Sequence, residues 1–441
     1  DKDSYEVFSI ISRNISIDKV EGEIVTAYAN KKGFNLFKEL NFEFKVLTPP
    51  SMMYKSILEN ASSERSIDSW DYYPNWEEYL NIMNQFVVDY PDLCELVNIG
   101  NSINGKGIYY IHINNNLGED QNEPEFVYTS SIHGDELVGY VLTLRYIDYL
   151  LSNYNTNTEV TDLVNNIDIW INPLANPDGT FAGGNNSVWG ATRFNANNVD
   201  LNRNFEDPED GPHPDGNAWQ TETLHNMAFA EDRNIVMSSN MHGGAEVVNY
   251  PWDTWPQLSA DDDWWVYVSR EYADLAHENG WAGYLNDFNN GITNGYAWYT
   301  ISGGRQDYMN YFHETREVTL ELSEIKTPPE GQLNAFWDAN YNSMLAYMKQ
   351  CQFGFSGIVT NAYNGNPIQA KVMIENHDFD NTEVHSHLPV GDYHRPIKAG
   401  TYDVTFSAFG CYDQTISVDI VDDERLVLDV QLIPIMPLTS E

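Results

Sequence analysis

Three side chains that can bind a metal ion lie just beyond two apolar runs of this 441-residue sequence. The first run, 125–130, leads toward His133 and Glu136, and the second, 235–241, leads directly into His242. Imidazole nitrogens and carboxylate oxygens are common zinc ligands, and a catalytic zinc site has three protein ligands and an open position for water. In an α/β sheet such sites form beyond the carboxyl ends of strands. The three residues are therefore candidate ligands, although HxxE spacing alone is also typical of ordinary polar residues at a helix start.

Two arginines stand close together in one polar segment. Arg193 and Arg203 bound the segment RFNANNVDLNR, in a chain that has only 23 basic residues. A guanidinium group can hold a carboxylate through two parallel hydrogen bonds. The segment therefore indicates either a carboxylate-binding site or structural ion pairs, which so acidic a chain also favours.

Carboxylates on a further predicted strand are candidates for proton transfer. The segment 317–322 has the alternation of a strand, which places Glu317 and Glu321 on the same face. A carboxylate held near a reacting water molecule can act as a general base. The spacing alone does not choose between the two glutamates.

The elements that would position these residues alternate between strands and helices. Strands are predicted at 125–130, 168–172, 235–241 and 317–322, and helices at 137–149 and 334–351. This alternation predicts an α/β fold with a central mixed sheet and helices on both of its faces.

Different patterns flank this central region. Before it, predicted strands at 23–29 and 42–47 enclose a predicted helix at 30–40, which makes a small β-α-β module. After it, short alternating runs separated by turn residues predict an all-β sandwich. The predicted organisation is the N-terminal module at 1–58, a linker at 59–71, the central domain at 72–352 and the sandwich at 353–441. The sequence leaves open whether the module shields a site or is a scaffold.

Composition limits the classes of partner. The net charge of −43, from 23 basic and 66 acidic side chains, excludes a general nucleic-acid-binding protein. No run of about 18 apolar residues is present, so no membrane insertion is expected. The charge indicates a well-solvated surface, a field that attracts cationic substrates, or both.

Cysteine usage and the first residues bear on the compartment. Three widely separated cysteines and no CxxC exclude a disulfide-built scaffold and a zinc finger. The sequence opens without a basic-then-apolar signal segment, which fits either a cytosolic protein or a processed chain. We expect a processed chain of a secreted or periplasmic protein, and a monomer.

Taken together, the motifs resemble those of a known family. Their order is HGDE, NPDG, RFNANNVDLNRNF, MHGGAEVVNYPWD, GITNGYAWYTISGGRQDY and EVTLELSEIKTPP, between about residues 130 and 330. This series resembles the M14 zinc carboxypeptidases and is most similar to their regulatory subgroup, the carboxypeptidase E, N and D type. The final β-rich segment, with GTYDVTFSAFGC, resembles the transthyretin-like domain of that subgroup.

The resemblance implies a role for each matching residue. One zinc ion per chain would be held by His133, Glu136 and His242. The substrate's terminal carboxylate would be held by Asn202 and Arg203 and covered by Tyr299. Arg193 would polarise the scissile carbonyl, and Glu321 would be the general base and acid. The implied activity is hydrolysis of the C-terminal peptide bond of peptides or proteins.

The resemblance also implies a preference for C-terminal Lys or Arg. In the resembled subgroup, the positions of Asp253 and Gln306 line the pocket for the terminal side chain. The sequence departs from the pattern at Arg305, where an apolar residue is common. If Arg305 enters the pocket, acidic or broad specificity is the alternative. A catalytically silent, peptidase-like binding protein is a further alternative, although every expected catalytic residue is present.

Overall fold

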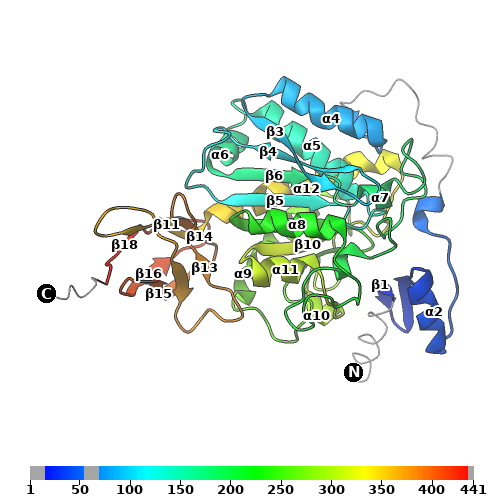
Figure 1. Ribbon diagram of the computed structural model, residues 1–441. Helices are drawn as coiled ribbons and strands as arrows, with labels where there is room; N and C mark the ends of the chain where they lie inside the picture. The colour runs from blue at the N-terminus through cyan, green and yellow to red at the C-terminus, as the bar shows by residue number, and fades with distance from the viewer. Residues whose placement is uncertain (1–14, 54–68, 436–441) are drawn as a thin grey trace.

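Three units that each contain a sheet follow one another along the chain (Figure 1). The computed structural model describes residues 15–53 and 69–435. A small N-terminal module (residues 15–53) and a C-terminal sandwich (residues 354–435) lie at opposite sides of a central domain (residues 69–352). None of the helices in these described ranges is long and apolar enough to cross a membrane.

An eight-stranded mixed sheet forms the centre of the molecule. Its spatial order is β3–β4–β6–β5–β7–β10–β8–β9. The strands are β3 (Cys94–Asn101), β4 (Gly107–Ile113), β5 (Glu125–Ser130), β6 (Asp168–Asn172), β7 (Ile235–His242), β8 (Glu246–Tyr250), β9 (Ile292–Asn294) and β10 (Arg316–Leu322). β6, β5, β7 and β10 run parallel to one another, whereas β4 and β8 pair antiparallel with the strands of this parallel block. The predicted central mixed sheet is confirmed, and the four apolar runs are its parallel strands.

Helices cover both faces of this sheet, because successive side chains of a buried strand point to opposite sides. Phe126 and Tyr128 of β5 pack into one core cluster, and Val127 between them packs into another. The first cluster includes α4 (Trp76–Asp89), α5 (Val138–Asn153), α6 (Thr158–Asn166), α9 (Asp262–Asn279) and α12 (Leu333–Lys349). The second includes α8 (Thr221–Glu231) and α11 (Arg305–Phe312). The predicted two-sided arrangement is therefore confirmed.

The C-terminal unit is a sandwich of two sheets, as predicted. One has the order β14–β11–β17, with β18 also paired to β11, and the other has the order β13–β12–β15–β16. The strands are β11 (Gly354–Asn361), β12 (Lys371–Ile374), β13 (Val384–His385), β14 (Asp392–Arg395), β15 (Gly400–Ser407), β16 (Gln414–Ile420), β17 (Arg425–Val427) and β18 (Val430–Leu432). Phe355, Tyr393 and Phe406 are fully buried between the sheets.

The N-terminal module differs from the predicted β-α-β order. An antiparallel pair, β1 (Ser16–Glu21) and β2 (Ile24–Tyr28), precedes α2 (Lys31–Glu39), so the order is β-β-α. The predicted helix is confirmed, and the side chain of Asn30 caps it by accepting a hydrogen bond from Gly33 N at 2.8 Å.

The strand predicted at 42–47 is wrong. Those residues form no strand, and in the described residues the small sheet consists of β1 and β2 alone. Phe44 packs on the helix instead, with its ring 5.3 Å from that of Phe34. The predicted linker, 59–71, falls mostly outside the described residues.

The connections of the parallel strands create a crevice at their carboxyl ends. β6 pairs with one side of β5, and β7, which comes later in the sequence, pairs with the other side of β5. At such a switch point the loops that follow the two strands diverge, and ligands bind between them. The loop after β5 and the end of β7 hold the three candidate metal ligands.

Candidate active site

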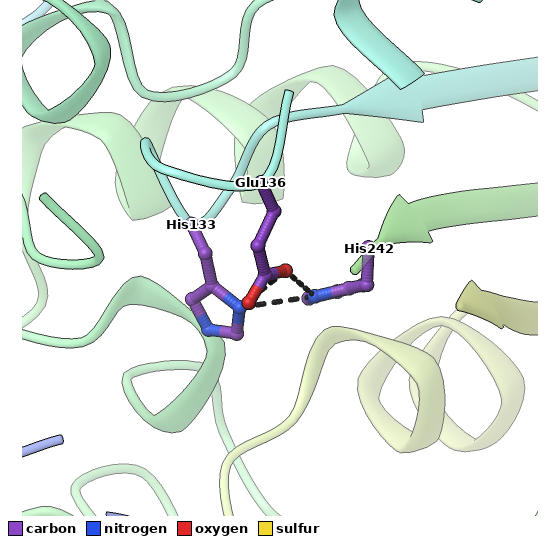
Figure 2. A group of neighbouring side chains, drawn as sticks. All are labelled: His133, Glu136 and His242. Carbon is purple, nitrogen blue, oxygen red and sulfur yellow. Dashed lines mark hydrogen bonds and ion pairs between the residues drawn. The ribbon is translucent and has the colours of Figure 1, made fainter. Parts of the chain in front are cut away.

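The three candidate metal ligands converge at the carboxyl ends of β5 and β7 (Figure 2). His133 and Glu136 lie on the loop after β5, and His242 is the last residue of β7. Glu136 Oε2 lies 3.0 Å from His133 Nδ1 and 2.8 Å from His242 Nδ1. The two Nδ1 atoms are 3.0 Å apart, and all three side chains are buried. Three potential ligand atoms therefore face one point.

These atoms fit a metal ion such as zinc. Asp200 Oδ1 lies 3.0 Å from His133 Nε2, so this carboxylate orients the imidazole with Nδ1 toward Glu136 and His242. Burial lowers the pKa of His242 to about 4, so its imidazole is neutral and able to coordinate. Two imidazole nitrogens and a carboxylate oxygen that face one point form an ordinary zinc ligand set.

Cations surround Glu136 and keep it ionised. Its Oε1 contacts Lys326 Nζ and lies 3.3 Å from Arg193 Nη1. Burial by itself raises the pKa of Glu136, but His133 and Lys326 outweigh it and hold the pKa well below its usual range. The carboxylate is therefore available as a ligand at neutral pH.

Tertiary structure separates the two glutamates that the strand pattern leaves equivalent. Glu317 is fully buried, and its Oε2 lies 2.5 Å from both Arg305 Nη1 and Ser238 Oγ. Glu321 instead lines the cleft of the metal cluster, and its Oε2 has no hydrogen-bond partner among the described residues. Burial raises the pKa of Glu321 well above its usual range, and Glu136 raises it further. Of the two glutamates, Glu321 is the one that lines the cleft.

Hydrogen-bond donors line the same cleft. They come from Arg193, Asn202, Arg203 and Tyr299. Arg193 Nε donates to Asp200 Oδ2 at 2.9 Å, which fixes its guanidinium beside the metal cluster. Arg203 is 7% exposed, and its Nε has no hydrogen-bond partner within residues 15–53 and 69–435. A nearly buried guanidinium with a free N–H is well suited to a carboxylate.

One end of the cleft is a buried anionic pocket. Asp253 lines the cleft together with Gly295, Ile301 and Thr319. Asn249 Nδ2 donates to Asp253 Oδ1 at 2.9 Å. Burial raises the pKa of Asp253 to about 6. The pocket therefore presents a carboxylate that is mostly ionised at neutral pH.

Gln306 and Arg305 do not line this cleft. Gln306 Oε1 accepts a hydrogen bond from Thr319 N at 2.8 Å, so its side chain supports the pocket wall from behind. Arg305 forms an ion pair with Glu317 in the core, where both side chains are buried. Gln306 therefore lies behind the residues that line the cleft, and its contact with substrate stays a prediction. Arg305 therefore lies in the core in this structure, and the choice between basic and acidic chain ends stays a prediction.

Several residues of the site escape the sequence patterns. Asp200 orients both His133 and Arg193, and the signal for it was its position inside the arginine-bounded segment. Lys326 lies on the loop after β10 and forms an ion pair with Glu136, a contact that only the folded chain creates. The NPDG turn also has a structural task, since Asn176 Nδ2 donates to a carbonyl of the ligand loop at 3.1 Å.

Comparisons with known proteins agree with this geometry. A family model described as zinc carboxypeptidase, Peptidase M14, matches residues 79–343. Carboxypeptidase D of Mus musculus is 34% identical over 413 residues, which cover 88% of this chain and 29% of that protein. The chain thus spans less than one third of the carboxypeptidase D proteins that it matches.

Other relatives are matched over most of their length. Carboxypeptidase SOL1 of Arabidopsis thaliana is 34% identical over 80% of this chain and 70% of that protein. The carboxypeptidase N catalytic chain of Mus musculus is 34% identical over 78% of this chain and 82% of that protein.

Solved structures share the fold. Carboxypeptidase A from Helicoverpa armigera superposes with a TM-score of 0.63 at 19% identity, over 79% of this chain and 94% of that one. Thrombin-activatable fibrinolysis inhibitor superposes with a TM-score of 0.59 at 18% identity, over 78% and 94% of the two chains. Together, the family match over more than half of the sequence and the close relatives show that this chain belongs to the zinc carboxypeptidase family, in the regulatory subgroup of carboxypeptidases D, M and N.

Proposed function

We propose that this protein is a zinc-dependent carboxypeptidase that removes the C-terminal residue of peptides and prefers Lys or Arg there. The proposal rests on the set of residues that line one cleft. It combines a metal-ligand cluster and the carboxylate of Asp253 with Glu321 Oε2 and Arg203 Nε, two atoms that have no hydrogen-bond partner in the part of the chain that the structure describes.

The residues around the metal cluster have different roles in the proposed hydrolysis. One zinc ion held by His133, Glu136 and His242 would act as a Lewis acid and lower the pKa of a water molecule to about 7. Glu321 takes a proton from the attacking water and returns it to the leaving amine, for which its raised pKa is suited. Arg193, held by Asp200, donates to the carbonyl oxygen as negative charge develops there.

Selectivity for a chain end follows from the donors beside the cluster. Asn202 and Arg203 bind the terminal carboxylate, which an internal peptide segment lacks. Tyr299 lies at the same wall of the cleft and covers the bound carboxylate. Asp253 pairs with a cationic terminal side chain inside the pocket. Existence as a monomer and a secreted or periplasmic location stay predictions from the sequence.

The role of Glu321 is tested by Glu321→Gln. The amide is nearly the same size but cannot accept the proton, so kcat should fall by a factor of about 10²–10⁴ while zinc content and thermal unfolding stay unchanged. Glu324→Gln is the matched control, because Glu324 follows three residues later and its side chain is exposed. Wild-type turnover by Glu321→Gln would remove Glu321 from the reaction.

Metal dependence is tested on the same peptides. Chelation should abolish release of the terminal residue, and one equivalent of zinc per chain should restore it. His242→Ala should lose both zinc and activity. Full activity in metal-free protein would contradict the proposal.

A further inference from the structure

The carboxylate of Asp253 is enclosed by close neighbours. Asp253 is 3% exposed, and Asn249 Nδ2 donates to its Oδ1 at 2.9 Å. Gly295, the first residue of α10 (Gly295–Trp298), lies against the same oxygen, because a Cβ there would be 1.7 Å from Asp253 Oδ1. Two heavy atoms that are not bonded cannot approach so closely, so the carboxylate fits here only because residue 295 is glycine. The Asp253 side chain therefore has a defined orientation in the pocket.

The backbone of Asp253 is held by a second carboxylate. Asp253 N donates to both oxygens of Asp307, at 3.1 Å to Oδ1 and 3.0 Å to Oδ2, and Thr254 N donates to Oδ2 at 2.8 Å. All three residues are buried, and Asp307 is only 1% exposed. A buried N–H group needs an acceptor, and Asp307 supplies one to two successive N–H groups. Asp307 therefore fixes the loop that carries the Asp253 side chain.

Asp307 belongs to the first turn of α11, and the two residues before it hold other walls of the cleft. Arg305 N donates to Asn202 Oδ1 at 2.8 Å. Because that bond occupies Oδ1, the NH2 group of Asn202 is the part of its amide left for a substrate carboxylate. Gln306 Oε1 accepts a hydrogen bond from Thr319 N at 2.8 Å. One helical turn thus connects the anionic pocket with a residue proposed to bind the terminal carboxylate.

We propose that Asp307 is a positioning residue for recognition of the substrate's terminal residue. It lies behind Asp253 and is not among the residues that line the described cleft. By holding the backbone of Asp253, it keeps the carboxylate of the pocket at a fixed place relative to Asn202. A terminal Arg or Lys can then occupy both binding positions at once. The inference rests on the proposed carboxypeptidase function and adds the residue that sets the geometry of its specificity.

A small displacement of Asp253 should have a large effect. A misplacement of about 1 Å at a recognition site can lower the efficiency of an enzyme about a hundredfold. In Asp307→Asn, an NH2 group replaces one oxygen, so a donor would face an N–H group of the loop. The two donors repel each other and the loop must move. The variant keeps the size of the side chain, which limits other changes in the core.

The role of Asp307 is tested with blocked peptides that end in Arg or in citrulline, which has nearly the shape of Arg but no charge. In the wild type, kcat/KM should be at least about tenfold higher on the Arg peptide. Asp307→Asn should bring this ratio near one, through a higher KM on the Arg peptide and little change in kcat. A ratio that stays at the wild-type value would overturn the role of Asp307.

Asp287→Asn is the matched control for this variant. Asp287 also accepts a backbone N–H, from Glu246 at 2.9 Å, but Glu246 is at the opposite end of β8 from the Asp253 loop. This substitution should leave the ratio of the two peptides unchanged. An equal fall of the ratio in both variants would indicate a general loss of structure and would also count against the role of Asp307.

Gly295→Ala moves the Asp253 carboxylate while Asp307 stays intact. The added methyl group has no room beside Asp253 Oδ1, and the carboxylate can turn away because it is the end of a side chain. The ratio of Arg to citrulline should therefore fall as it does in Asp307→Asn. Gly331→Ala adds the same methyl group where the described chain leaves open space, so it should keep the wild-type ratio. An unchanged ratio in Gly295→Ala would show that the place of this carboxylate does not determine specificity, and the inference would be wrong.

A measurement without turnover separates this inference from the proposed function. Hydrogen exchange of the Asp253 and Thr254 amides should accelerate in Asp307→Asn, because their shared acceptor is altered. A wild-type ratio near one for the two peptides would refute the proposed basic preference. In that event unchanged exchange would still overturn the positioning role, whereas accelerated exchange would support it.

Discussion

At the scale of single residues, the proposed preference for basic chain ends depends on Asp253. Its carboxylate is buried, and its Oδ1 is held by Asn249 at 2.9 Å. Removing one partner of a desolvated ion pair costs roughly 3–5 kcal/mol. Asp253→Ala should therefore lower kcat/KM on peptides ending in Lys or Arg at least about a hundredfold, and on apolar ends much less. A peptide panel that differs only in its last residue measures both effects.

The same residue predicts a pH dependence. Burial raises the pKa of Asp253 to about 6, so the carboxylate becomes neutral as the pH falls through that value. Only the ionised form attracts a cationic side chain, so the preference for Arg over Leu should be full well above about pH 6 and decline below it. The ratio of kcat/KM values for the two peptides cancels titrations that affect both.

Asp253→Asn is the control for that profile. The amide does not titrate, so the ratio should be low and independent of pH between about pH 5 and pH 8. A wild-type ratio that stays constant over the same range would contradict the assignment to Asp253.

At the scale of elements, one buried acid joins the central domain to the sandwich. Asp261, next to the start of α9, accepts two hydrogen bonds from Arg395 of β14 at 2.8 Å and one from Arg316 of β10 at 3.2 Å. Arg395 also pairs with Asp378 at 2.7 Å. Asp261→Ala would leave buried guanidinium groups short of an anion, so the free energy of unfolding should fall by roughly 3–5 kcal/mol. Denaturant unfolding measures this loss.

A half-exposed pair is the control for that variant. Glu383 contacts Lys371 at 2.5 Å, but the lysine side chain is 38% exposed. Glu383→Gln should therefore change the free energy of unfolding by only about 0–1 kcal/mol. Equal small effects from the two variants would show that the Asp261 network does not stabilise the junction.

At the scale of the whole molecule, the net charge of −43 should attract cationic peptides before they bind. Salt screens this attraction over a Debye length of about 8 Å at physiological ionic strength. Added salt should therefore lower kcat/KM on Lys- and Arg-rich peptides through KM, with little change in kcat. A neutral peptide with one C-terminal Arg is the comparison, and an equal salt effect on both would assign the effect to the pocket instead of the long-range field.

Much of the central domain follows from sequence because its signals are local. The apolar runs at 125–130 and 168–172 coincide with β5 and β6, since a strand buried on both faces needs a continuous apolar run. His133, Glu136 and His242 could be singled out because each lies at or just beyond the end of such a strand. Strand ends of a parallel sheet meet at one edge, so this placement already brings the three residues close together.

Tertiary structure alone decided the features that depend on partners distant in the sequence. Glu317 and Glu321 share one face of a strand, and only the neighbour Arg305 makes the first a core ion pair and leaves the second in the cleft. The alternation at 42–47 fits a strand, but a strand also needs a neighbour to pair with, and among the described residues no strand pairs with this segment. The pairing of Asp18 with Lys326 has no local signal, because 308 positions separate residues that contact only after the whole chain has folded.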